Sequence, residues 1–482
     1  MSKNIRNSAW NLIDIFLYPF LFLITTPYFI DRLGEKEFGV WMLVNSVMIT
    51  MQVFNLGLGT AVFKHVAAHL SVKAYDKIKL TFNTNFSLSC LIHIACILVS
   101  VSLAIGVKYF SFFKIEPAYI NLVSGGIVLG GTIVGFKFYE QLVSYTFKAF
   151  ERFDLAAWIS SGTKLTILFL NILLVYFGYG LITLLISGII ISSLGILMGI
   201  LFIKRLIPAF TLSFHYEKTS IRHELKFAVW PWFQSLAIII TFQCDRFFVV
   251  TYIGLATLTY YGLVATMFNH IHMGFNAIAP WLAPKITKLK TQGKEIKELY
   301  LTTRNFSLVI SLTVLLVFSI VNAPILKLFL SIDKYQHAAG FIKLFTLFEL
   351  FFVYAIVPNY FLNAAGHERL YFKIVIFYCT TIILGMLTGY YFNRTAEGIL
   401  EGLTVGTAIS MFTQNWVIDK KIFKADGLKD SLILFLPVVL IVLSILSSSL
   451  LIKSGLIIIS LLSLYLVFIK YFKINLNLIK FE

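Results

Sequence analysis

The chain has 482 residues, of which 59% are hydrophobic, 16% aromatic and only 13% charged. This composition excludes an ordinary soluble domain. The formal net charge of +17 does not indicate nucleic-acid binding, because the basic residues form short clusters between apolar runs rather than one basic soluble face. The four cysteines also lie inside apolar runs and form no CxxC pair, so we expect them to be small core residues.

Apolar runs of about 20 residues, enough to cross a bilayer, recur from end to end. The first run follows the N-terminus without a small-residue cleavage site and is expected to be a retained span rather than a signal peptide. The sequence therefore predicts an all-α integral membrane protein. Its fourteen predicted spans are 8–30, 38–62, 81–107, 118–147, 156–178, 180–203, 227–253, 255–284, 305–330, 337–365, 372–392, 396–418, 431–452 and 454–472.

Basic residues between these spans predict the orientation of the chain. With the N-terminus in the cytoplasm, most Lys and Arg residues fall in cytoplasmic segments, including the clusters at 64–79 and 285–297. The positive-inside rule then favours cytoplasmic N- and C-termini. The external segments are short, so no soluble catalytic domain is expected outside the membrane.

An internal repeat links the two halves of the chain. "PYFIDRLGEKEFGVW" (27–41) is similar to "DRFFVVTYIGLATLTYYGLV" (245–264), and "GLGTAVFKHVA" (57–67) to "AIAPWLAPKIT" (277–287). The offset of about 220 residues spans six helices, an even number, so both copies enter the membrane from the same side. We expect two six-helix lobes related by a pseudo-twofold axis along the membrane normal. The predicted parts are 1–206 (N-lobe), 207–226 (cytoplasmic linker), 227–418 (C-lobe) and 419–482 (a cytoplasmic loop and spans 13 and 14).

Polar residues in the first and seventh spans form stripes at helical spacing. In span 1, Asp14 belongs to such a stripe, and in span 7 Gln234 shares a face with Asp245. Ionisable groups in a membrane normally face a partner or a wet cavity. Arg246 either pairs with an acid on a neighbouring helix or faces a cavity, where its guanidinium attracts a diphosphate. Asp245 would then tune that arginine or bind a coupling ion.

Spans 4, 5 and 10 carry further embedded charges. Lys137 and Glu140 are spaced i, i+3, so they either neutralise each other or serve a cavity. Lys164 either extends toward the cytoplasmic surface or faces the cavity. Lys343 is a cavity candidate two turns inside the outer end of span 10, and Glu349 lies about 120° further round that helix.

Span 8 carries a polar stripe that ends near Pro280. Its members Asn269, His272 and Asn276 are predicted to contact the substrate. His270 and His272 lack i, i+4 spacing and have no carboxylate neighbours, so no metal site is expected. No cofactor is expected either, and no protease, prenyl-diphosphate or ATPase motif is present.

Four segments in order resemble the polysaccharide transporter family, the flippases of lipid-linked oligosaccharide units in the superfamily that also contains multidrug extruders. The segments are "RLGEKEFGVW" (32–41), "NLGLGTAVFKHVA" (55–67), "FKAFERFDLAAW" (147–158) and "CDRFFVVTYIG" (244–254). Asn55 departs from the family pattern, in which an acidic residue is common before LGLG. The resemblance implies two lobes around a cavity that opens alternately to each side of the bacterial cytoplasmic membrane. It also implies an undecaprenyl-diphosphate-linked glycan as cargo, for surface polysaccharides such as O-antigen.

The sequence therefore predicts a flippase and not an enzyme. Its partners would be the lipid-linked glycan, membrane lipids and other glycan-assembly membrane proteins, which spans 13 and 14 could dock, but no nucleic acid. Three alternatives are a cation-coupled multidrug extruder, an integral glycan polymerase or ligase, and a passive scaffold. The predicted substrate-binding residues are Arg246, Lys343, Lys164, Lys137, Asn269, His272, Asn276 and Gln234, and the coupling candidates are Asp245, Asp14, Glu140 and Glu349.

Overall fold

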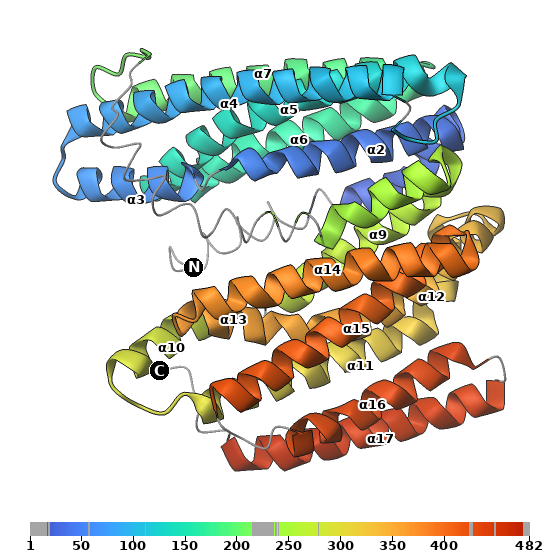
Figure 1. Cartoon of the computed structure of the whole chain (residues 1–482). Coiled ribbons are helices and arrows are strands. Elements are labelled where there is room, and N and C mark those ends of the chain that lie inside the picture. The colour runs from blue at the N-terminus through green and yellow to red at the C-terminus, as the bar shows by residue number, and fades with distance from the viewer. Residues whose placement is uncertain are drawn as a thin grey trace. The chain divides into compact units, whose positions relative to one another are not determined.

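A computed structural model gives the fold (Figure 1). It describes residues 20–55, 58–110, 112–214, 241–277, 279–423, 428–447 and 450–475, with the isolated positions 17, 236 and 239. Within these ranges all regular structure is helical. Eight of the helices are long and apolar enough to cross a membrane. The prediction of an all-α multi-pass membrane protein is confirmed.

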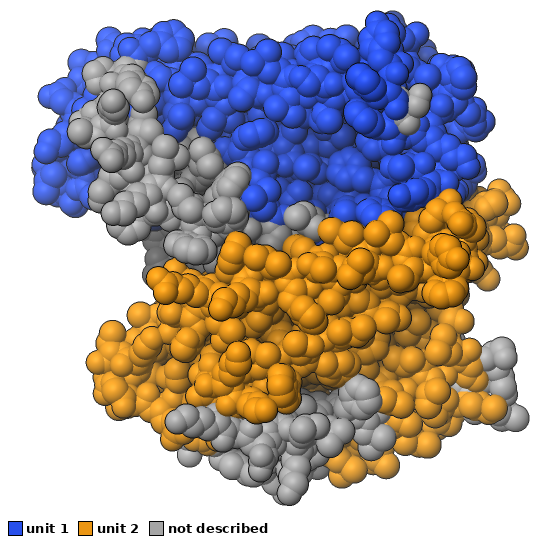
Figure 2. Space-filling view, viewed as in Figure 1, with its two compact units in different colours: residues 1–263 blue, residues 264–482 orange. Residues whose placement is uncertain are grey.

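Contacts divide the chain into two compact units, residues 1–263 and 264–482 (Figure 2). The boundary falls inside α9 (Leu255–Asn276), whose first turns belong to unit 1. The other helices of unit 1, besides helical residues 20–33 and 241–252, are α2 (Glu35–Met51), η1 (Gln52–Asn55), α3 (Leu58–Ser71), α4 (Tyr75–Phe110), α5 (Pro117–Ala149), α6 (Phe153–Tyr176) and α7 (Leu181–Leu206). The predicted lobes, with their linker at 207–226, remain a prediction.

Unit 2 contains the remaining helices. They are α10 (Leu282–Thr291), α11 (Lys297–Phe329), α12 (Ile332–Phe352), η2 (Val353–Ala355), α13 (Ile356–Ala364), α14 (Glu368–Asn393), α15 (Ala396–Lys421), α16 (Leu428–Leu446) and α17 (Leu450–Asn475). The last two helices pack against each other and correspond to the predicted spans 13 and 14. Side chains exposed along α17 are mostly large and apolar, as is expected of a surface that faces lipid.

Two predicted spans that correspond in the internal repeat are both interrupted. Span 2 is divided into α2 and α3, with η1 after α2, and span 8 is divided into α9 and α10. In the second case the helix stops at Asn276, shortly before Pro280, whose ring disfavours the continuation of a helix. In both copies the second piece leads into the basic segment predicted to lie in the cytoplasm.

The helices of unit 1 assemble around α5, which packs against α2, α3, α4, α6 and α7. Small residues allow some of these close approaches. A Cβ at Gly131 would lie 2.2 Å from the Ser100 Oγ on α4, for example. Helix α5 therefore contacts each of the other numbered α-helices of the group that precede α9.

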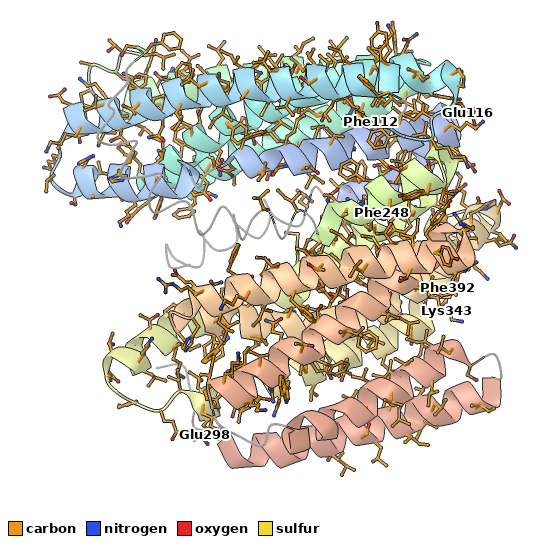
Figure 3. The ribbon with its side chains drawn as sticks, viewed as in Figure 1. Phe112, Glu116, Phe248, Glu298, Lys343 and Phe392 are labelled. Atoms are coloured by element: carbon orange, nitrogen blue, oxygen red, sulfur yellow. The ribbon has the colours of Figure 1, made fainter. Side chains whose placement is uncertain are left out.

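Three consecutive charged residues at the start of α2 connect this helix to other elements at one end of unit 1. Glu35 accepts hydrogen bonds from Thr259 and Tyr260 of α9. Lys36 donates to Glu116, which precedes α5 and lies at one end of unit 1 (Figure 3). The Glu37 carboxylate accepts a hydrogen bond from the backbone N–H of Leu181, the first residue of α7. The first N–H groups of a helix have no acceptor within the helix, and Glu37 supplies one.

The close approach at this end also depends on glycine. Gly34 adopts a φ of +83° between helical residues 20–33 and α2, a conformation that L side chains rarely adopt. Gly39 lies against α9, and a Cβ there would be 2.2 Å from the Leu255 carbonyl oxygen. The segment "RLGEKEFG" therefore joins α2 to α5, α7 and α9.

The centre of unit 2 is tightly packed. Helices α14 and α15 touch backbone to backbone, and a Cβ at Gly402 would lie 1.9 Å from the Gly385 carbonyl oxygen. Such small-residue contacts are typical of helix pairs in membranes. Aromatic rings fill the space between α9, α12 and α14, where Phe348 stacks on Phe352 at 5.2 Å and Phe352 on Tyr378 at 6.0 Å.

Candidate functional site

Unit 1 contains a cavity of about 460 Å³ that is lined by both polar and apolar side chains. Its described walls come from α2, η1, α5, α6 and α7, which all belong to this unit. The polar residues that line it are Asn45, Gln52, Lys137, Glu140, Gln141, Ser144, Tyr145, Lys148, Ser160, Thr163, Lys164, Asn171 and Ser192. A space of this size, with several lysine, hydroxyl and amide groups on its walls, can hold a ligand that has polar groups.

Charged side chains around this cavity are predominantly basic. Lys137, Glu140 and Lys148 come from α5, and Lys164 comes from α6. Positions 137 and 148 are eleven residues apart, which returns to nearly the same face of a helix. Lys137 lies within electrostatic range of Glu140 and Lys164. Among the described residues, three lysines and one glutamate give the lining of the cavity an excess of positive charge.

Neutral polar groups complete the walls of the cavity. Ser144, Ser160 and Ser192 are buried against it from three different helices. Asn171 accepts a 2.8 Å hydrogen bond from the Ser187 hydroxyl, which holds the amide in place beside α7. Hydroxyl and amide groups of this kind can both donate and accept hydrogen bonds. The cavity therefore offers cationic and neutral hydrogen-bonding groups in one space.

Asp245 and Arg246 lie buried in helical residues 241–252 of unit 1. The Tyr261 hydroxyl of α9 donates a 2.7 Å hydrogen bond to Asp245 Oδ2. Arg246 Nη1 donates a 2.8 Å bond to Gln243 on its own helix. Arg246 Nε and Nη2 have no hydrogen-bond partner among the described residues, and no described acid forms a salt bridge with this arginine. Nε and Nη2 are the pair of donors with which a guanidinium binds oxyanions bidentately, and no described residue accepts a hydrogen bond from them.

His272 and Glu349 meet in unit 2. The distance between His272 Nδ1 and Glu349 Oε1 is 2.7 Å, and the two side chains are 10% and 1% exposed. They come from α9 and α12, 77 residues apart. The expectation that His272 has no carboxylate neighbour was wrong, because it considered neighbours along the chain and not those brought close by folding. In the described part of the chain no group of three or more potential metal ligands is found.

The other predicted site residues are more dispersed. Lys343 is exposed on α12, toward the end of unit 2 where Phe392 also lies (Figure 3), and does not line the cavity of unit 1. Asn269 and Asn276 are half-buried on α9. Gln234 and Asp14 lie outside the described residues. The structure therefore brings together Lys137, Glu140 and Lys164 at one place, and His272 and Glu349 at another.

Three charged residues were not singled out from the sequence. Lys148 follows the predicted end of span 4 and reads as a cytoplasmic lysine, although its spacing from Lys137 was a usable signal. Arg304 and Asp419 each lie one residue outside a predicted span. In the structure Arg304 Nη1 lies 3.2 Å from an Asp419 oxygen, with side chains only 2% and 4% exposed. This buried pair joins α11 to the end of α15.

The chain was compared with known proteins. The model of a family described as "Polysaccharide biosynthesis protein" matches residues 32–339. A protein named "Putative O-antigen transporter" from Shigella flexneri is 20% identical over 407 residues, which cover 84% of this chain and 93% of that protein.

Two solved structures share the fold. One is an inward-facing multidrug resistance MATE family transporter of the MOP superfamily, with a TM-score of 0.66, 11% identity, and coverage of 85% of this chain and 92% of the other. The second is the lipid II flippase MurJ in an inward closed conformation, with a TM-score of 0.65, 13% identity, and coverage of 97% and 100%. At these identities the likeness shows the fold alone. It is the fold of a membrane transporter, as predicted.

Proposed function

This chain belongs to the polysaccharide biosynthesis protein family, and from that premise we propose that it is a flippase for undecaprenyl-diphosphate-linked oligosaccharide units. It would move them across the bacterial cytoplasmic membrane by alternating access. The prediction that the chain is a transporter and not an enzyme agrees with its relatives, which are named as transporters and a flippase. The coarser conclusion, a multi-pass membrane protein of this family, stands independently of the cargo.

The cationic cavity of unit 1 is the observation that carries the proposal. A diphosphate-linked glycan has an anionic head group and many hydroxyl groups, and its prenyl chain is at home in lipid. Lys137, Lys148 and Lys164 supply positive charge, and the serine and amide side chains supply hydrogen bonds. Placing three lysines and one glutamate at membrane depth is costly without an anionic ligand or water to solvate them. An anionic cargo would offset this cost while it crosses.

Arg246 is proposed as a second contact for the diphosphate. Its Nε and Nη2 atoms form a rigid pair of donors, which matches two phosphate oxygens in a way that a lysine cannot. Asp245 lies next to it and is held by Tyr261, so we assign the carboxylate a positioning role. Lys343, Asn269, Asn276 and Gln234 stay candidates for contacts with the glycan.

Transport by reconstituted protein tests this proposal. The probe is a defined undecaprenyl-diphosphate-linked oligosaccharide in proteoliposomes, with a membrane-impermeant reagent reporting which leaflet holds the glycan. We expect Lys137→Met and Lys164→Met each to slow translocation about tenfold or more, because a hydrogen bond to a charged group contributes roughly 1.5–3 kcal/mol. Lys77→Met, at an exposed position on α4, is the matched control and should leave the rate unchanged.

The alternative function, a multidrug extruder, can be tested in the same proteoliposomes. Its cargo would be an organic cation, which the excess of lysines in the cavity repels. If the wild-type protein moves an organic cation and leaves the lipid-linked glycan in place, the flippase proposal is wrong. Equal translocation rates for Lys137→Met and Lys77→Met would show that Lys137 in the cavity does not contribute to transport.

Arg246 is tested separately. Arg246→Ala should abolish translocation of the same probe, and Arg246→Lys should keep part of it, because the charge remains while the paired donors are lost. Thermal unfolding of both variants in detergent provides the control. A loss of stability in Arg246→Ala without a specific loss of transport would show that the arginine supports the helix and does not bind cargo.

We also propose the orientation with both termini in the cytoplasm. After replacement of the four native cysteines, single cysteines at Lys73 and Lys294 should react with an impermeant thiol reagent only from the cytoplasmic side. A cysteine at Arg394 should react only from the outside. All three positions are exposed. Labelling of Lys73 and Arg394 from the same side would contradict the predicted order of spans.

A further inference from the structure

The interior of unit 2 contains the buried pair of His272 and Glu349, which the cavity of unit 1 does not explain. The imidazole Nδ1 and the carboxylate Oε1 are 2.7 Å apart, a short distance for a hydrogen bond. The Phe352 ring stacks on His272 with 4.4 Å between ring centroids, and this shields the pair from one side. Glu349 is 1% exposed. The pair is thus held in place and separated from bulk water.

Among the described residues, few other ionisable groups lie near the pair. Helix α12 packs against α11, α15, α16 and η2. Of the titratable groups that α11 and α15 present, Arg304 and Asp419 are bonded to each other. Tyr354 of η2 and Tyr378 of α14, which stacks on Phe352, are the nearby phenols, and His270 is half-buried on α9. Within the described residues, His272 is the ionisable group that interacts electrostatically with Glu349.

The charge balance of such a pair restricts it to one proton. With one proton it is electrically neutral overall, either as imidazole with carboxylic acid or as imidazolium with carboxylate. Removing that proton, or adding a second, would bury a net charge in a packed region of the membrane, which is strongly unfavourable. The pair can therefore gain or lose a proton only when a conformational change brings water to it. Coupling of transport to a proton gradient requires a site with this property.

We propose that His272 and Glu349 form a proton-binding site that couples the conformational cycle to the proton gradient. One proton is taken up between Nδ1 and Oε1 from one side of the membrane and released to the other side in each cycle. No covalent bond changes. The coupling to cargo rests on the function proposed above, whereas the binding of the proton does not.

A pH gradient across proteoliposomes tests the coupling. The lipid-linked oligosaccharide described above is the probe, and valinomycin with equal potassium on both sides holds the membrane potential at zero. One coupled proton allows the wild-type protein to accumulate the probe up to about tenfold for each pH unit of gradient. Glu349→Gln should abolish this accumulation while it still exchanges the probe downhill. Glu401→Gln, at an exposed position on α15, should accumulate it like the wild type.

Two outcomes distinguish the two proposals. If the wild-type protein translocates the probe but ignores the pH gradient, the proton site is wrong and the flippase stands. The site is equally wrong if Glu349→Gln accumulates the probe as the wild type does. If the wild-type protein does not translocate the probe at all, the flippase proposal fails, and the proton site is decided by a measurement that needs no cargo.

That measurement is infrared difference spectroscopy of the full chain in lipid nanodiscs between acidic and alkaline buffer. We expect a carboxyl band that disappears in Glu349→Gln and shifts in His272→Gln, because the histidine is the hydrogen-bond partner. His337→Gln is the control, since that side chain is 58% exposed. A spectrum unchanged by Glu349→Gln would overturn the proposal. Thermal unfolding checks that each variant is folded.

Discussion

The cavity of unit 1 and the packed interior of unit 2 differ in how their charged side chains are balanced. In unit 1 three lysines and one glutamate surround a cavity and remain unequal in number. The described part of unit 2 contains two buried acid–base pairs, His272 with Glu349 and Arg304 with Asp419. The helices of unit 2 are also packed backbone to backbone at Gly385 and Gly402.

Packing explains this difference. A cavity can hold water or a ligand, so the charges that line it need not cancel one another. A packed core offers neither, and each charge there must be neutralised by a neighbour with suitable geometry. An imbalance of charge beside a cavity therefore indicates a ligand, whereas a balanced pair in a packed region indicates stability or a proton.

The largest expected effect concerns the pair in unit 2 that we assign to stability. Asp419→Ala leaves the Arg304 guanidinium buried without its counter-charge, which costs about 3–5 kcal/mol. Thermal unfolding in detergent should show a pronounced loss of stability. Asp333→Ala is the control, because that side chain is 82% exposed. The double variant Arg304→Met with Asp419→Leu should recover most of the loss. Equal melting temperatures for Asp419→Ala and Asp333→Ala would contradict the assignment of this pair to stability.

A smaller effect is expected from adding one methyl group in each unit. In unit 2 the new Cβ of Gly402→Ala would lie 1.9 Å from a backbone oxygen, so α14 and α15 must separate at a cost of about 1–3 kcal/mol. In unit 1 Gly188→Ala places its Cβ 3.7 Å from Ile133, an ordinary contact beside the cavity. Helix propensity should then stabilise this variant by up to about 1 kcal/mol. Thermal unfolding compares the two, and a greater loss for Gly188→Ala would contradict the difference in packing.

The smallest expected effect is on stability when a cavity charge is removed. Lys137→Met should change the free energy of unfolding by no more than about 0.5 kcal/mol, because Lys137 is exposed within the cavity. The same variant is expected to lose transport, so the two measurements separate binding from folding. Destabilisation as large as that of Asp419→Ala would show that Lys137 is a structural partner, and the contrast between the units would disappear.

The helices could be predicted well from the sequence because each span depends on local composition. About 20 apolar residues in a row suffice to recognise one, and helical spacing suffices to place Lys137 and Glu140 on one face. The same rule placed Glu349 on a different face from Lys343, and the structure buries the first and exposes the second.

The pairs between helices could not be predicted in this way. His272 and Glu349 are 77 residues apart, and their contact depends on how α9 packs against α12. Arg304 and Asp419 were overlooked for a different reason. Each lies one residue beyond a predicted span, where a charged residue is expected to meet water, and only the packing of the helix ends shows that both are buried.

The charged start of α2 has a consequence for the synthesis of the protein. Glu35 is bound by Thr259, which lies 224 residues later in the chain. A ribosome adds about 5–20 residues per second, so roughly 10–45 seconds pass between the two. During this interval α2 to α7 have been synthesised, while the backbone carbonyl of Glu35 lacks Thr259 and its carboxylate lacks Tyr260. Until α9 emerges, that end of the nascent protein is open, and membrane insertases and chaperones have this time in which to engage it.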